Sequence, residues 1–238
     1  MSVIFKREFK SYFQNVTGFV FIAVLILFSG AFITLYNFKS LYSSISYTID
    51  ALMICCAPLI PMLTMNVIAK DRRSGACQLL YSLPLRSSSI VLGKYFAMLA
   101  IFAIPTAFLA IMPLIFNFMG DVNYLVSYSS ILCFFLFGAA LIAICMFMSS
   151  LSDNIILCAV FNYITVIFFI ALYMAMPLIS SLPAGETVSK ILSVFSIFGK
   201  FEPFVYGIFD IRAIIYYLSV GALFVFLSVR SFERRRLA

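Results

Sequence analysis

The stretch VNYLVSYSSILCFFLFGAALIAICMFMSSLS, residues 122–152, contains no charged side chain. It is longer than the roughly 20 apolar residues that an α-helix needs to cross the hydrocarbon core of a bilayer. One charge at the centre of a spanning helix costs about 2.5–3.5 kcal/mol on the insertion scale, so charge-free runs indicate membrane spans. Five further runs of this kind occur in the chain: 11–38, 51–69, 95–120, 154–185 and 213–229.

The amino-acid composition supports the same interpretation. Apolar residues make up 64% of the chain and charged residues 11%, against about 45–50% and 25% in soluble domains. A soluble domain of this size cannot bury so much apolar surface, whereas lipid does not require it to be buried. We therefore expect an all-α polytopic membrane protein, with residues 1–238 forming a single transmembrane domain.

The charge-free runs predict six transmembrane helices. Pro58 and Pro61 fall in the second helix, and Pro105 and Pro113 fall in the third. Each proline removes a backbone hydrogen bond and is expected to kink its helix. Such kinks are hinges of a moving transporter or features that shape helix packing, and the sequence leaves both interpretations open. The expected spans are 17–36, 50–69, 95–118, 127–149, 155–179 and 212–230.

The distribution of basic residues predicts the orientation. An even number of spans places both termini on one side of the membrane. The segments on that side carry twelve Lys and Arg residues, and those on the other side carry four. The positive-inside rule makes the first side cytoplasmic. The formal charge of +7 is then a consequence of topology and of contact with anionic headgroups, so we expect membrane lipids and not nucleic acid as partners.

The segment 3–15 precedes the first span and predicts an interfacial helix. Phe5, Phe9, Tyr12 and Phe13 recur at helical spacing, with basic residues between them, which is typical of a helix on a membrane surface. A signal peptide is the alternative. It does not fit, because the apolar run is too long and no small-residue cleavage site follows it.

The sequence offers little chemistry of its own. The Gly-Lys pair Gly93-Lys94 lacks the first glycine and the hydroxyl residue of a phosphate-binding loop. The chain has no His, and its nine carboxylates lie in loops or at the ends of spans. Its six cysteines form no C-x-x-C pair, and we interpret them as small apolar side chains that pack within helices. We expect no catalytic, cofactor or metal site here, and we interpret Asn162, inside the fifth span, as a helix-packing residue.

The segment 70–94 joins the second and third spans and is strongly basic. Gly75 permits a break after Lys70–Arg73, and Leu79 and Leu80 supply one buried face of a short helix. Leu83-Pro84 ends that helix, because the residue before proline is biased away from helix. Ser87–Ser89 then offers N-caps for a helix that continues into the third span. A short helix across the cytoplasmic surface suits a subunit driven by a soluble motor; a basic loop that only fixes topology is the alternative.

Three patches of the sequence resemble one family. They are KREFKSYF at 6–13, DRRSG at 71–75 followed by Leu83-Pro84 and VLGK at 91–94, and FEPF at 201–204 followed by Gly207 and DIR at 210–212. With these patches the chain resembles a permease of the ABC-2 transporter family over essentially its whole length. It looks nearest to the branch associated with gliding-motility and copper-oxidase-maturation ABC systems. The middle patch is the most specific of the three.

The resemblance implies what drives the protein. In that family the loop between the second and third spans forms a coupling helix that docks in a cleft of a separate ATP-binding cassette ATPase, and two permease chains work by alternating access. The chain departs from the family at Lys70-Asp71 and near Gln78, where acidic residues are frequent, so the charge match to the ATPase differs. The resemblance also implies export across the inner membrane of a prokaryote. The expected coupling residues are Asp71, Arg72, Arg73, Ser74, Gly75, Leu79, Leu80, Leu83 and Pro84.

The resemblance further implies short external helices between the fifth and sixth spans. Segment 189–209 fits this expectation, with an apolar stripe of Ile191, Leu192, Phe195 and Phe198. The aromatic residues that follow are interpreted as an external gate or as an aromatic belt at headgroup level. These gate candidates are Phe201, Phe204 and Phe209.

Two other functional classes stay open at this point. The first is a self-sufficient secondary transporter or channel, which six spans and kinking prolines allow. The second is a membrane scaffold with the tail Arg234–Arg236 as its attachment point. The residues do not indicate the substrate, or whether the second permease chain is identical or related.

Overall fold

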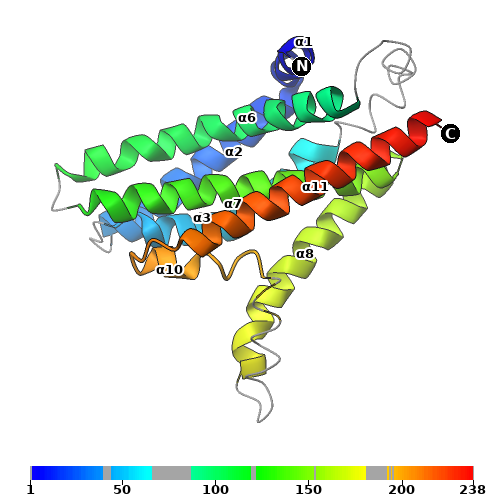
Figure 1. The fold of residues 1–238 in the computed structure, drawn as a ribbon. Helices are drawn as coiled ribbons and strands as arrows, with labels where there is room; N and C mark the ends of the chain where they lie inside the picture. The colour runs from blue at the N-terminus through cyan, green and yellow to red at the C-terminus, as the bar shows by residue number, and fades with distance from the viewer. Residues whose placement is uncertain are drawn as a thin grey trace.

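The computed structural model describes residues 2–39, 44–65, 87–118, 122–152, 154–180, 192, 194 and 196–237. Every regular element in these ranges is a helix, so the predicted all-α fold class is confirmed (Figure 1). The helices are α1 (Ser2–Gln14), α2 (Val16–Phe32), the π-helix η1 (Ile33–Lys39), α3 (Ser46–Cys56), the helix Leu59–Met65, α6 (Ser87–Phe116), α7 (Tyr124–Leu151), α8 (Ile155–Ser180), α10 (Glu202–Val205) and α11 (Ile211–Leu237).

Among the described residues, five helices are long and apolar enough to cross a membrane. They are α2 continued by η1, α6, α7, α8 and α11. A sixth span results when α3 and Leu59–Met65 are joined across the break between them. These elements overlap all six predicted spans, and the number of spans is five or six according to how the broken pair is counted. The third span begins at Ser87, where the serines predicted a helix start.

Two prolines explain the break between α3 and the helix Leu59–Met65. The axes of α3 and Leu59–Met65 differ by 47° across the break. Pro58 and Pro61 carry no N–H group, so the carbonyls of Ile54 and Ala57 lose their helical donors at the bend. The predicted kink in the second span is therefore confirmed. By contrast, α6 continues as a single helix through Pro105 and Pro113.

The central helix of the bundle is α7, which lies between α6 and α11 (Figure 1). It approaches α6 very closely at Gly138. A Cβ atom added at this position would lie 2.2 Å from Cε1 of Phe102, a distance that no side chain tolerates. The ring of Phe102 in turn packs on Phe134, with 5.4 Å between the ring centroids. The absence of a side chain at Gly138 thus allows an aromatic ring of α6 to enter the core.

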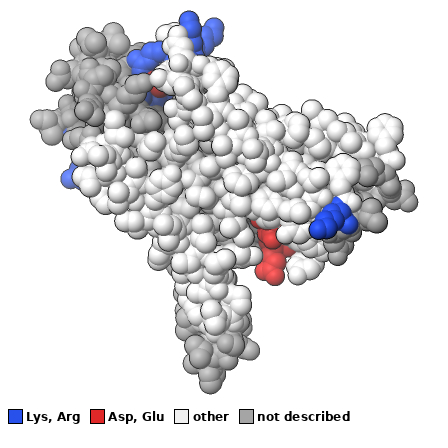
Figure 2. Space-filling model, turned by 180° about the vertical axis from the view of Figure 1, so that it is seen from behind, with Lys and Arg blue, Asp and Glu red and all other residues white. Residues whose placement is uncertain are grey.

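Helix α8 diverges from the rest of the bundle. It starts beside the ends of α7 and α11 and then leaves them at an angle (Figure 1). Only 17% of its most apolar 18 residues are buried, against 72% for α7. The face seen in Figure 2 is largely uncharged where it is described, with few Lys, Arg, Asp and Glu side chains. Such a surface suits contact with hydrocarbon.

Candidate functional site

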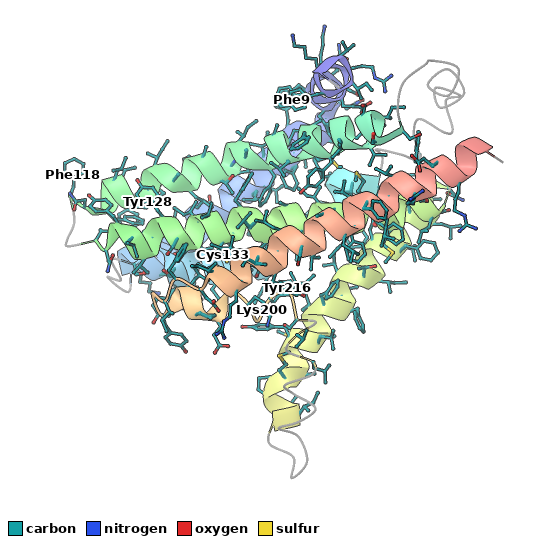
Figure 3. All side chains as sticks on the ribbon, viewed as in Figure 1. Phe9, Phe118, Tyr128, Cys133, Lys200 and Tyr216 are labelled. Carbon is teal, nitrogen blue, oxygen red and sulfur yellow. The ribbon has the colours of Figure 1, made fainter. Side chains whose placement is uncertain are left out.

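The predicted coupling residues all fall in 66–86, outside the described residues. The flanks of this segment are described. Leu59–Met65 ends just before it, and α6 begins just after it at Ser87. Both flanks lie at the end of the bundle that holds α1 and the C-terminal end of α11 (Figure 1). We call this the terminal end; Figure 3 places Phe9 there and Phe118 and Tyr128 near the opposite end.

The flank that precedes the segment is tied into the bundle by a polar cluster of Thr64, Ser149 and Asn162. All three side chains are fully buried. The amide nitrogen of Asn162 donates to Oγ1 of Thr64 at 3.2 Å and to Oγ of Ser149 at 3.0 Å. The hydroxyl of Ser149 donates to the carbonyl of Thr64 at 3.3 Å. Asn162 therefore joins α8 to α7 and to the second span, which confirms its predicted packing role.

The flank that follows the segment holds a buried charge. The side chain of Lys94, near the start of α6, is only 2% exposed. Its Nζ lies 3.5 Å from Oε1 of Glu8 in α1, and the same oxygen accepts a 2.6 Å hydrogen bond from Nη2 of Arg7. An ammonium group in so apolar a setting requires a countercharge. Sequence reasoning named Glu8 and Lys94 in separate motifs and did not pair them.

Helix α1 confirms the predicted helix at 3–15 and carries an aromatic stripe. The rings of Phe5 and Phe9 stack at 5.8 Å, and those of Phe9 and Phe13 meet at 5.0 Å. Phe19 of α2 extends the stripe, with 5.3 Å between its ring and that of Phe13. Lys10 is exposed beside these rings. Aromatic and basic side chains on one helix surface are typical of contact with a membrane interface.

The gate candidates lie together near α10. Phe201 and Phe204 are fully buried and stack at 6.2 Å, whereas Phe209 is 48% exposed and meets Phe204 at 6.0 Å. Ser130 of α7 donates its hydroxyl to the carbonyl of Phe204. Gly207 turns the chain after α10 with a φ of +78°, which favours glycine. A belt residue lies against lipid, so Phe209 alone fits that interpretation.

The segment before α10 is described in part. Ile191 and Phe195 of the predicted stripe lie outside the described residues, and Phe198 is buried against Phe137 with 5.0 Å between the rings. In the described part of this connection, α10 is a four-residue helix, and Leu192 and Val194 are helical as well. The expectation of short helical structure between the last two spans is met to this extent.

A groove of about 350 Å³ lies between α7, α8 and α11. Its walls are apolar and include Phe169, Leu223 and Phe224. Near Tyr216, another residue of its lining, the ammonium group of Lys200 stands 5.6 Å from the ring centroid. Figure 3 shows both residues in the opening between α8 and α11.

These features define a class: an all-helical integral membrane protein. Comparison with protein families makes this specific. The family model described as "ABC-2 family transporter protein" matches residues 32–230, which is most of the chain. The chain therefore belongs to the ABC-2 family and is a permease of an ABC transporter. The family associates in general with an ATPase subunit and is typically not itself enzymatic. No curated protein matches the chain.

Proposed function

We propose that the chain is the membrane-spanning subunit of a prokaryotic ABC exporter that works by alternating access. Two permease chains, identical or related, combine with two separate ATPase subunits, which bind and hydrolyse the ATP. Membership of the ABC-2 family carries this proposal. The likeness of the three sequence patches supports a place in the gliding-motility and copper-oxidase-maturation branch. The shared end of the two termini (Figure 1) and the excess of Lys and Arg there support cytoplasmic termini in the inner membrane.

The proposed contact with the ATPase is the segment 71–84. Its sequence supports this role through the DRRSG patch and the apolar pair Leu79-Leu80. The flanks support it as well, because each is held by buried polar contacts, at Thr64 on one side and at Lys94 on the other. A push received between two such anchors passes to the second and third spans.

At the opposite end we propose an external gate of Phe201, Phe204 and Phe209. Phe201 and Phe204 are packed in the core and Phe209 lies at its edge. The three rings therefore form a continuous plug that extends from the buried core to the surface. Opening this plug requires the segment around α10 to separate from α7, to which Ser130 ties it. The uncovered apolar surface of α8 suits membrane lipid and the second permease chain.

The test is a gentle pull-down of the tagged chain from its native membrane, with all partners identified by mass. The variant replaces Asp71, Arg72 and Arg73 together with Ala. The matched control replaces Arg234, Arg235 and Arg236 with Ala, which removes three charges from the C-terminal tail. We expect a nucleotide-binding ATPase with the native chain and the control, and its loss with the 71–73 variant.

The other outcomes of the pull-down are informative. An ATPase that survives the 71–73 substitution keeps the functional class and moves the contact away from this segment. Loss of partners with the tail variant alone favours a scaffold. The absence of any ATPase from the native complex contradicts the proposal and favours a self-sufficient transporter or channel.

A further inference from the structure

Helix α1 buries a face that differs from its aromatic stripe. Ile4, Glu8 and Tyr12 are each separated by four residues, so they lie in one row along the helix. All three are buried, although Glu8 is charged and Tyr12 carries a hydroxyl. A surface-bound helix normally buries apolar side chains only. The polar members of this row therefore indicate a specific contact with the bundle.

Tyr12 reaches the flank that precedes the coupling segment. Its hydroxyl donates a 2.8 Å hydrogen bond to the carbonyl of Leu63, and the contact is buried. Leu63 lies near the end of the helix Leu59–Met65, which leads into 66–86. The backbone of Gly18 in α2 approaches Tyr12 closely, because a Cβ atom added at Gly18 would lie 2.8 Å from the carbonyl oxygen of Tyr12. The turn from α1 into α2 thus holds Tyr12 against the second span.

Glu8, one turn earlier in the same row, reaches the flank that follows the segment. Its carboxylate pairs with Nζ of Lys94 at 3.5 Å, and Arg7 adds a second cation at 2.6 Å. Lys94 lies in the second turn of α6, which begins at Ser87. Two adjacent turns of α1 therefore contact the helix Leu59–Met65 and the start of α6, which are the two flanks of the segment 66–86.

We infer that α1 is a clamp that fixes the separation of the two flanks, with Glu8 and Tyr12 as positioning residues. The clamp holds the two flanks of 66–86 at a set separation before the ATPase binds, so docking does not have to fix that separation. This inference rests on the proposed function. It is not contained in the family match, which begins at residue 32, after α1 has ended.

The first readout measures the flanks directly and needs no ATPase. Nitroxide labels are introduced at positions 62 and 88 of the full chain through a bio-orthogonal amino acid, and the distance distribution is recorded in lipid nanodiscs. Met62 and Ser88 are partly exposed and lie on the two flanks. We expect a narrow distribution for the native chain. Glu8→Lys broadens it, because two ammonium groups then face each other in a buried site, and Tyr12→Phe broadens it less.

The double variant E8K/K94E distinguishes loss of the clamp from loss of folding as the cause of a broadened distance distribution. It restores the ion pair with opposite polarity, apart from the contribution of Arg7, and is expected to recover most of the narrow distribution. The matched control is Glu233→Lys. Glu233 also pairs with a basic residue, Arg230 at 3.6 Å, at the terminal end of the molecule, and its reversal leaves the distribution unchanged. A distribution that stays narrow in E8K, or one that E233K broadens equally, overturns the inference.

The second readout is the amount of ATPase retained in the pull-down. We expect E8K to reduce retention about tenfold and E8K/K94E to restore most of it, because the separation of the two flanks must then be fixed on docking. Full retention in E8K, despite a broadened distribution, overturns the positioning role. If the native chain itself retains no ATPase, the proposed function fails, and the label distances still decide whether α1 clamps the flanks.

Discussion

Helices α7 and α8 follow each other in the chain and are almost equally apolar, yet they are buried to opposite degrees. In their most apolar 18 residues, 72% of α7 and 17% of α8 are buried. The stretch 138–143 of α7 consists largely of Gly and Ala, whereas α8 presents Ile164, Ile167 and Phe168 outward. Hydropathy identifies a span, but the size of its residues decides whether neighbours approach closely enough to make it a core.

The largest effect is expected where α6 enters α7. Gly138→Val places new atoms inside the ring of Phe102, and we expect a loss of about 3 kcal/mol, the upper end for overpacking. The measurement is the yield of monodisperse protein and its resistance to unfolding in detergent. Gly30→Val is the control, because a Cβ atom there meets nothing within 4 Å. Equal losses in both variants contradict the close packing at Gly138.

A buried isoleucine of α7 gives the next effect. Ile142 is fully buried, and Ile142→Ala is expected to cost about 2 kcal/mol, the low end of the range for such a deletion in a soluble core. The low end applies because lipid, unlike water, does not penalise exposed apolar surface. The free energy of unfolding in mixed micelles checks the value. If Ile142→Ala costs less unfolding free energy than a substitution on the protein surface, the proposed difference in burial between α7 and α8 is contradicted.

The polar cluster at the start of α8 gives a smaller effect. Asn162→Leu removes both hydrogen bonds from Asn162 to Thr64 and Ser149, and we expect a loss of about 1 kcal/mol in the same unfolding measurement. Thr165→Val is the control. Its hydroxyl is exposed and bonds only the carbonyl of Phe161 in its own helix among the described contacts. An effect of Thr165→Val as large as that of Asn162→Leu contradicts the anchoring role of the cluster.

The smallest effect is expected on the outer face of α8. Ile167 is 62% exposed, so Ile167→Ala changes the free energy of unfolding of a single chain by less than about 0.5 kcal/mol. The comparison with Ile142→Ala uses the same substitution in both helices. A large loss at Ile167 in a chain shown to be monomeric contradicts the exposure of this face. A loss that appears only in a dimeric preparation indicates that a second chain covers it.

Much of the fold was predictable because lipid imposes simple rules. Each of the five or six candidate spans among the described residues coincides with a charge-free run, and Pro58 and Pro61 located the break in the second one. The central position of α7 was not predicted, although the small residues of 138–143 carried the signal. The pairing of Glu8 with Lys94 was not predictable from spacing, since it joins positions 86 residues apart. Buried polar pairs of this kind depend on tertiary packing and leave no periodic pattern.

The central claim is that an ATPase drives this permease through residues 71–84, and crosslinking in the native membrane tests it most directly. A photoreactive amino acid is placed at position 79, and the crosslinked partner is identified by mass. Position 36, at the far end of the first span, is the control. The account predicts a crosslink from position 79 to a nucleotide-binding ATPase and none from position 36. An ATPase that crosslinks elsewhere on the chain but never at position 79 contradicts it.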